Sequence, residues 1–386
     1  MNIVLFANNE KQMYPLCFTR AFGDLRMGIF TFRERWEKLF STSISCLTAD
    51  YLQDLYPLML EQDNLFINSA YFPTHDFIIG LRNLKPQQGI WENSECLGFR
   101  GSWEEFQDKE NLDKIQLAEK QLKINRPYDL FMNNQQALLF DFALATKDRE
   151  SAEIPSGNKI IGRENIFVEE GAKVTFATLN ASEVPIYLGK NSEIMEGAVI
   201  RGGLALCEKA TIKMGAKIYG ETTIGPHCKV GGEIKNVIFN GFSNKAHDGY
   251  LGNSVVGEWC NLGANTNASN LRNDYGMVDL WDYTENKYTE TGLQFCGVFI
   301  GDHSKLAINS KINTGSVIEG FSNIFAEGFI PRKVPMFNFS GKRNGPKLKL
   351  QQVFDSAENT MKRRNIPLSD AYKKMITYLY NLKNNQ

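Results

Sequence analysis

Residues 188–230 read LGKNSEIMEGAVIRGGLALCEKATIKMGAKIYGETTIGPHCKV and place an aliphatic residue at every sixth position. The aliphatic positions are Leu188, Ile194, Ile200, Leu206, Ile212, Ile218, Ile224 and Val230. An α-helix repeats about every 3.6 residues and a strand about every two, so neither explains a period of six. A period of six is explained by a chain that coils as a triangular prism, with one short parallel strand per face and one inward aliphatic residue per strand. The period therefore predicts a left-handed parallel β-helix.

The same spacing returns from Ile300 to Ile330 but is interrupted twice before that. Ile238 follows Val230 by eight residues, which predicts a two-residue insertion near residues 233–235. Residues 265–294 are too polar to line the axis, and they predict a longer loop extruded at a corner, where such solenoids often carry their binding sites. We expect the β-helix domain to occupy residues 153–337.

The rest of the chain predicts an α/β domain at residues 1–152 and a helical tail at residues 338–386. The α/β domain has expected strands at residues 3–6, 44–47 and 65–67, and expected helices at residues 32–40 and 131–145. In the tail, apolar residues recur at helical spacing, Pro367 separates two helices, and Ser369 is a suitable N-cap. We expect the tail to pack against a neighbouring coil and to cover the open end of the solenoid.

Composition excludes several classes of protein. Hydrophobic residues make up 42% of the 386 residues, charged residues 23%, and the net charge is −1. This balance argues against nucleic acid or an anionic membrane as a partner, and no apolar run approaches the roughly 20 residues of a membrane helix. The first residues lack the pattern of a signal peptide. The seven cysteines are scattered without a CxxC pair, so we expect reduced thiols and a cytoplasmic location.

Three motifs in the second half resemble the acetyltransferase domain of the GlmU family, bifunctional acetyltransferases and uridyltransferases that act on sugar 1-phosphates. They are EIKN at residues 233–236, SNKAHDGYLGN at 243–253 and VGEWCNLGANT at 256–266. The N-terminal motifs PLCFTR at 15–20, DLRMG at 24–28 and DLF at 129–131 extend the likeness. The resemblance implies a GlmU-like chain with a shortened, nucleotidyltransferase-like (Rossmann-like) first domain.

The resemblance also implies roles for single residues. His247 matches the general base that takes the amine proton during acetyl transfer, a task that suits a pKa near 6.5. Lys235 and Lys217 match cations that hold the sugar phosphate, and Ala264 and Asn309 match the acetyl-CoA site. Tyr250, Asn261 and Asn270 match residues near the sugar and the acyl donor. Structural alternatives remain open, because Tyr250 also fits the sixfold pattern and asparagines stabilise β-helix corners.

The N-terminal domain departs from the pattern of active sugar nucleotidyltransferases. Its first strand is followed by ANNE at residues 7–10, without the glycines that let backbone amides approach phosphates. Arg20 and Arg26 are the expected nucleotide-binding residues. The position of a Mg²⁺-binding aspartate falls at residues 68–69, Asn-Ser, and Asp76 and Asp129 are possible substitutes. The metal ligands stay unassigned.

We predict a transferase that uses acetyl-CoA and an amino-sugar 1-phosphate, joined to a Mg²⁺-dependent nucleotidyl transfer from a nucleoside triphosphate to a sugar 1-phosphate. As in most such β-helices, we expect a homotrimer. The alternative is a non-catalytic or single-activity scaffold that binds a sugar nucleotide. A zinc-dependent γ-class carbonic anhydrase is disfavoured, because the four histidines, His75, His227, His247 and His303, are too far apart in sequence.

Overall fold

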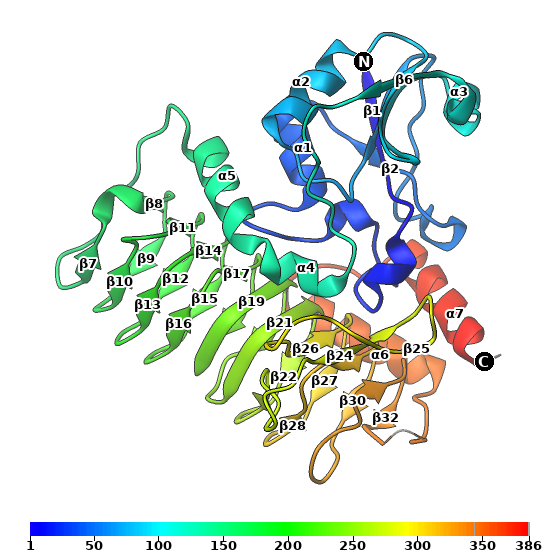
Figure 1. Ribbon diagram of the computed structural model, residues 1–386. Helices are drawn as coiled ribbons and strands as arrows, with labels where there is room; N and C mark the ends of the chain where they lie inside the picture. The colour runs from blue at the N-terminus through cyan, green and yellow to red at the C-terminus, as the bar shows by residue number, and fades with distance from the viewer. Residues whose placement is uncertain (343, 385–386) are drawn as a thin grey trace. The chain divides into compact units, whose positions relative to one another are not determined.

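The computed structural model describes residues 1–342 and 344–384 (Figure 1). The chain divides into two compact units, which are treated separately below. The first comprises Met1–Met13, Thr19–Leu25 and Phe30–Arg126. The second comprises Tyr14–Phe18, Arg26–Ile29 and the chain from Pro127 onward. Two short N-terminal loops and the helices after Pro127 thus group with the β-helix, and the domain boundary at residue 152 stays a prediction.

The first unit is built on a six-stranded mixed sheet with strand order β2-β1-β3-β5-β4-β6. β5 runs antiparallel to both of its neighbours, and the other pairs are parallel. The expected strands and the first helix are confirmed, and the Thr31–Glu34 capping box begins that helix at the expected residue. The strands are β1 (Asn2–Phe6), β2 (Ser45–Cys46), β3 (Asn64–Asn68), β4 (Gln88–Glu92), β5 (Glu95–Gly101) and β6 (Asp113–Gln116). The helices are α1 (Phe32–Phe40), α2 (His75–Asn83) and α3 (Trp103–Gln107).

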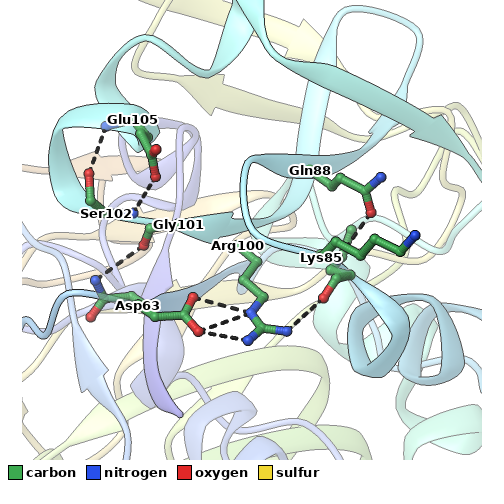
Figure 2. Close-up of polar contacts among 9 residues, drawn as sticks. Asp63, Lys85, Gln88, Arg100, Gly101, Ser102 and Glu105 are labelled. Atoms are coloured by element: carbon green, nitrogen blue, oxygen red, sulfur yellow. Dashed lines mark hydrogen bonds and ion pairs between the residues drawn. The ribbon is translucent and has the colours of Figure 1, made fainter.

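Figure 2 shows the polar contacts that fix β3 against β5. Asp63, just before β3, accepts hydrogen bonds from Nε and a terminal nitrogen of Arg100 at 2.7–3.1 Å. Arg100 also donates to the Leu84 carbonyl at 2.9 Å, and the Ser102–Glu105 capping box follows at once. These contacts lie at the amino end of β3. The parallel strands β1 and β3 end at the opposite edge of the sheet, where open α/β sheets commonly bind their ligands.

The second unit contains the expected parallel β-helix, and Figure 1 shows its coils following one another from β7 to β32. Three strand columns form three faces. Face A contains β7 (Lys159–Ile161), β10 (Thr178–Asn180), β13 (Val199–Arg201), β16 (Lys217–Tyr219), the first halves of β19 (Glu233–Gly241) and β21 (Tyr250–Glu258), β23 (Asn267–Ala268) and β28 (Lys311–Ile312).

Face B contains β8 (Ile166–Val168), β11 (Ile186–Leu188), β14 (Leu204–Leu206), β17 (Thr222–Ile224), the second halves of β19 and β21, β26 (Val298–Ile300), β29 (Ser316–Ile318) and β31 (Lys333–Val334). Face C contains β9 (Lys173–Val174), β12 (Glu193–Ile194), β15 (Thr211–Ile212), β18 (Lys229–Val230), β20 (Asn244–Lys245), β22 (Asn261–Leu262), β27 (Lys305–Leu306), β30 (Asn323–Ile324) and β32 (Phe339–Ser340). The sixfold aliphatic residues fill the axis between the three faces.

The predicted insertion near residues 233–235 is wrong, because the coil there is shorter than its neighbours. Paired residues of adjacent coils are 18 positions apart at Ile200 and Ile218, but only 16 apart at Ile218 and Ile234. Ile234, fully buried, fills the axis. The corner before it is tight because Gly232 has a φ of 73°, and an added Cβ there would lie 2.7 Å from a backbone oxygen.

The expected corner extrusion is present between faces A and B but begins later than residue 265, because Asn267 and Ala268 form a face A strand and Ala268 fills the axis. After β23 the chain leaves the coil, forms the antiparallel hairpin β24 (Asp279–Asp282) and β25 (Lys287–Glu290), and re-enters at β26. The regular pairing then resumes between Val256 and Ile300. We call residues 271–296 the insertion.

Four helices complete the second unit: α4 (Pro127–Met132), α5 (Asn134–Thr146), α6 (Leu350–Lys362) and α7 (Asp370–Asn384). The Ser369 side chain accepts a hydrogen bond from the Tyr372 amide at 3.2 Å, as expected of an N-cap. The tail contacts the corner between faces B and C over several coils, from the carbonyl of His227 to the ring of Phe337. None of the helices in the described residues is long and apolar enough to span a membrane.

Candidate functional site

His247 lies exposed on the corner between faces C and A. Two residues earlier, Lys245 occupies an axial position that is aliphatic in most coils, and it is 1% exposed. Its Nζ donates hydrogen bonds to the carbonyls of Gly231 at 3.0 Å and His247 at 2.8 Å. Burial lowers the pKa of Lys245 to about 8. The backbone that carries the candidate base is therefore held from inside the solenoid.

The two residues expected at the acetyl-CoA site share this corner with His247. The coils are in register here, since Asn244 pairs with Asn261 and Asn261 pairs with Lys305. The residues three positions later, His247, Ala264 and Ile308, therefore stack in consecutive coils. The Asn309 amide donates to the Ala264 carbonyl at 2.8 Å, and the Asn265 amide side chain donates to Asn309 Oδ1 at 2.8 Å. We call this row the His247 edge. Ala264 presents only a methyl group next to His247, whereas Ile308 in the following coil is an exposed apolar side chain.

The expected sugar-binding residues gather on face A, next to the His247 edge. Lys217, Glu233 and Tyr250 are register partners in three consecutive coils. Lys235 lies two residues after Glu233 and points to the same side of the sheet. Leu251, and not Tyr250, fills the axis, which removes the core role as an explanation for Tyr250.

Tyr250 and Asn270 meet across Gly252. A Cβ at Gly252 would collide with both the Tyr250 hydroxyl and the Asn270 amide, so only glycine permits this approach. Asn270 is 7% exposed, and its Nδ2 donates to Asn253 Oδ1 at 2.7 Å. Burial raises the pKa of Tyr250 and a hydrogen bond from Asn270 partly offsets this, so the phenol stays protonated at neutral pH.

Lys235 is held by aromatic rings and not by carboxylates. Its Nζ lies 5.8 Å from the ring centroid of Tyr219 and 5.4 Å from that of Phe295, near the end of the insertion. The Tyr219 hydroxyl donates to Glu233 at 2.6 Å, and this hydrogen bond, with burial, raises the Tyr219 pKa. Within the described residues Lys235 has no ion-pair partner, so its charge is available to an anion.

A pocket of about 530 Å³ extends this cluster along face A. Its lining includes Arg201, Lys217, Tyr219 and Glu233, together with Glu183 and Glu221. Cations and carboxylates thus face one space, an arrangement that suits a ligand carrying both a phosphate and an amine.

One expected residue lies elsewhere. Asn261 is exposed on face C, where it pairs with Asn244 and Lys305, on the far side of the corner from Tyr250 and Lys235. Its contact with a sugar stays a prediction, and within one chain it is separated from the other sugar-binding candidates by the corner.

Glu233, Tyr219, Asn253 and Phe295 belong to the cluster but were not singled out from the sequence. Glu233 could have been found, because strand residues two apart share a side and it precedes Lys235 by two. Tyr219 could not, because its pairing with Lys235 depends on the shortened coil.

The residues expected at the nucleotide site are divided between the two units. Arg20 is 4% exposed in the first unit. Arg26 belongs to the second unit, where its Nε donates to the Asn240 carbonyl at 3.2 Å and a terminal nitrogen donates to the Ile29 carbonyl at 2.5 Å. These bonds use much of its hydrogen-bonding capacity, and binding of a nucleotide by Arg26 stays a prediction.

At the carboxyl ends of β1 and β3, the polar side chains are engaged with backbone carbonyls and with one another. Asn68 donates to the Cys96 carbonyl at 3.2 Å, and Ser69 donates to the Phe6 carbonyl at 3.0 Å. Glu95 accepts from Tyr71 at 2.9 Å and from Lys123 at 2.6 Å. Burial raises the pKa of Glu10, just after β1, to about 7.

Metal-binding geometry is not evident. In residues 1–342 and 344–384, no three His, Cys, Asp or Glu side chains are grouped to hold an ion. Asp76 lies in the first unit and Asp129 in the second. The donor set therefore does not fit a protein-built Mg²⁺ site.

Comparison with known proteins agrees with both halves of this description. Residues 3–150 match the family model for sugar nucleotidyl transferase. The bifunctional protein GlmU of Trichodesmium erythraeum is 31% identical over 128 residues, which are 33% of this chain and 23% of that protein. A bifunctional sugar-1-phosphate nucleotidylyltransferase/acetyltransferase of Sulfurisphaera tokodaii is 32% identical over 102 residues, 26% of this chain and 25% of that protein.

A putative uncharacterized acetyltransferase of Escherichia coli, YaiX, is 28% identical over 157 residues, 40% of this chain and 67% of that protein. The chain thus spans about a quarter of the length of the two bifunctional relatives. Residues 3–150 thus match the sugar nucleotidyl transferase family, and parts of the chain are similar to bifunctional GlmU proteins, as the motifs predict.

Proposed function

We propose that the β-helix transfers an acetyl group from acetyl-CoA to the amine of an amino-sugar 1-phosphate. The observation that carries this proposal is the position of His247 on one edge with Ala264 and Asn309, beside the cluster of Lys217, Lys235 and Tyr250 on face A. A base, an accessible backbone for a thioester and cations for a phosphate are the three elements that this reaction requires.

In the proposed reaction the amine nitrogen attacks the thioester carbonyl carbon, and the carbon–sulfur bond breaks. The His247 imidazole accepts the proton that the amine loses, and the coenzyme leaves as a thiol after it takes up a proton. Lys235 and Lys217 hold the phosphate dianion. Tyr250 and Asn270 orient the sugar hydroxyls, and Asn261 is assigned to the acyl-donor side of the corner.

We further propose a homotrimer in which the His247 edge faces a second copy of the chain. The edge and its neighbouring positions expose large apolar side chains: Phe176 is 68% exposed, Met214 67%, Ile308 66% and Phe325 52%. Phe176, Met214 and Ile308 follow the axial residues of face C by two positions, as His247 does, and Phe325 follows by one, so exposed apolar side chains along this corner support a covered surface. Sedimentation equilibrium of the full chain checks this, with the mass of three chains expected. The seven buried free cysteines support a cytoplasmic location.

For the first domain we propose nucleotidyl transfer from a nucleoside triphosphate to a sugar 1-phosphate, with Mg²⁺ supplied with the nucleotide. One observation favours the alternative, a domain that binds a sugar nucleotide without turnover. Asn68 and Ser69 stand where a metal-binding carboxylate is expected, and both side chains are engaged with backbone carbonyls. Pyrophosphate release with UTP or dTTP, lost on adding EDTA, would support catalysis. Saturable nucleotide binding without pyrophosphate release would support the alternative.

The acetyltransferase proposal is tested by His247→Gln, which keeps a polar side chain but removes the base. We expect the rate of coenzyme A release in the presence of glucosamine 1-phosphate to fall about 100-fold or more, with little change in KM. His75→Gln is the matched control, since His75 is an exposed histidine on α2. If both variants match the wild type, His247 is not the base.

A further inference from the structure

A second pocket lies on the insertion, away from the face A cluster. It has a volume of about 340 Å³ and is lined by Trp281 and Tyr288 of the hairpin and by Arg332 and Lys333 at β31, with two prolines and Asn344. We call it the hairpin pocket. It shares no lining residue with the pocket on face A, and nothing in the proposed acetyl transfer uses it.

The two cations of the hairpin pocket are held by the two aromatic rings. Lys333 Nζ lies 3.8 Å from the ring centroid of Trp281, and the Arg332 guanidinium carbon lies 4.5 Å from that of Tyr288. The rings themselves meet edge to face at 5.2 Å. Because the aromatic rings fix both side chains, an anion that enters meets cations that are already positioned.

The hairpin pocket also has unused hydrogen-bond donors. The Trp281 indole N–H and the Arg332 Nε–H are buried, and neither has a hydrogen-bond partner among the residues that the structure describes. A buried donor without an acceptor is unfavourable, and both donors belong to residues that line the pocket, which favours an acceptor-rich ligand there.

The balance of charge gives the sign of that ligand. Lys333 Nζ lies 3.9 Å from Glu319, whose charge offsets that of the lysine. Arg332 donates to the Asp279 carbonyl and has no carboxylate within ion-pair distance in the described part of the chain. The pocket therefore presents a planar guanidinium, the group that best matches phosphate oxygens.

We propose that the hairpin pocket is a binding site for a small phosphate ester, independent of the acetyl-transfer site. The phosphate oxygens accept from Arg332, Lys333 and Trp281, and the organic part lies against the prolines. This site is separate from the proposed acetyl transfer, and a binding measurement alone tests it.

The test uses the full chain labelled with 5-fluorotryptophan, with the Trp281 ¹⁹F resonance assigned from Trp281→Phe. Glucose 1-phosphate and inorganic phosphate are titrated into protein that carries Lys235→Ala, which weakens binding at face A. We expect a saturable shift of the Trp281 signal, and an affinity about tenfold or more weaker in Arg332→Gln. Lys287→Gln is the matched control, since it removes an exposed cation from the same hairpin but does not line the pocket.

Two results would overturn the proposal. One is a Trp281 resonance that does not move at millimolar phosphate ester. The other is a shift that chloride reproduces, or that survives in Arg332→Gln with unchanged affinity. Because the readout is binding at Trp281, failure here is distinguishable from failure of acetyl transfer, which is followed by coenzyme A release.

Discussion

At the scale of single residues, Lys245 links the fold to the site. The sixfold pattern calls for an aliphatic residue at its axial position, and its partners there are Val230 and the apolar Leu262. A lysine in this place is costly unless its ammonium is hydrogen-bonded, and two corner carbonyls satisfy it. One of them belongs to His247. We infer that Lys245 positions the candidate base through its backbone.

Lys245→Met separates stability from function. Methionine fills the axis with a similar length and no charge, so we expect the midpoint of thermal unfolding to stay the same or rise. The corner loses its two hydrogen bonds, so we expect kcat for acetyl transfer to fall about tenfold or more, with KM changed less. Unfolding and steady-state kinetics measure both. An unchanged kcat in a stable variant would remove Lys245 from this role.

The candidate site shows what motif spacing can and cannot predict. The residues Lys217, Lys235, Tyr250 and Asn270 were expected together, and they lie together on face A. Asn261 was expected with them but lies on face C, because it precedes the corner at Ala264. Tyr219 escaped notice because its partner is fixed by a coil length that the sequence pattern misassigned.

At the scale of elements, a ladder of six stacked rings runs along the corner between faces B and C. Each ring stands three residues after an axial residue of face B, and all six residues have a φ between 54° and 63°. Adjacent ring centroids are 4.2–6.0 Å apart and nearly parallel. The rings belong to His227, Phe242, Trp259, His303, Phe321 and Phe337. The sequence carried this signal, but it becomes visible only once the axial residues are known.

Phe321→Ala tests the contribution of the ladder. Phe321 is 3% exposed and stacks between His303 and Phe337, so removing its ring leaves a cavity and an exposed neighbour. We expect the free energy of unfolding to fall by about 3 kcal/mol in urea titrations. Tyr275→Ala is the matched control, an aromatic residue with a similar positive φ that is 68% exposed, and it should change little. Equal effects of the two substitutions would show that stacking contributes nothing.

Helices and strands could be predicted from the sequence where local signals agree. The assignment of loops to one compact unit or the other could not. Helix α1 begins at Phe32 and ends at Phe40, as expected, because a capping box and an apolar stripe mark it. The assignment of loops 14–18 and 26–29 to the second unit depends on contacts far along the chain, such as those of Arg26 with Asn240. No local pattern encodes such contacts.

At the scale of the whole molecule, buried thiols and amines determine how stability depends on pH. Burial raises the pKa of several thiols from 9.0 to about 12, so the unfolded chain loses these protons first and stability falls as pH rises above 9. Burial lowers the pKa of Lys245 and Lys305 from 10.5 to about 8, so stability rises between pH 8 and 10.5. The thiols are Cys46, Cys96, Cys260 and Cys296, and the Cys228 pKa is raised in the same way.

Above pH 9 the five thiols lower the free energy of unfolding more than the two amines raise it, so we expect this free energy to be greatest near pH 9. Above that pH the thiols and amines alone should make it fall by about 4 kcal/mol per pH unit, which follows from about 1.36 kcal/mol for each uncompensated proton, and buried tyrosines with a raised pKa, such as Tyr71 and Tyr187, steepen the fall above pH 10. Urea titrations under reducing conditions between pH 7 and 10.5 measure this, with a moderate rise from pH 8 to 9 before the fall. A stability that keeps rising to pH 10 would contradict the assigned burial of the thiols.

The central claim is that this chain acetylates an amino-sugar phosphate at the His247 edge. The most direct measurement incubates the full-length wild-type protein with acetyl-CoA and glucosamine 1-phosphate, then quantifies the free thiol and the N-acetylated sugar phosphate by mass spectrometry. The account predicts one molecule of N-acetylated product for each coenzyme A released. No turnover, or coenzyme A released together with acetate and no N-acetylated sugar, would contradict it.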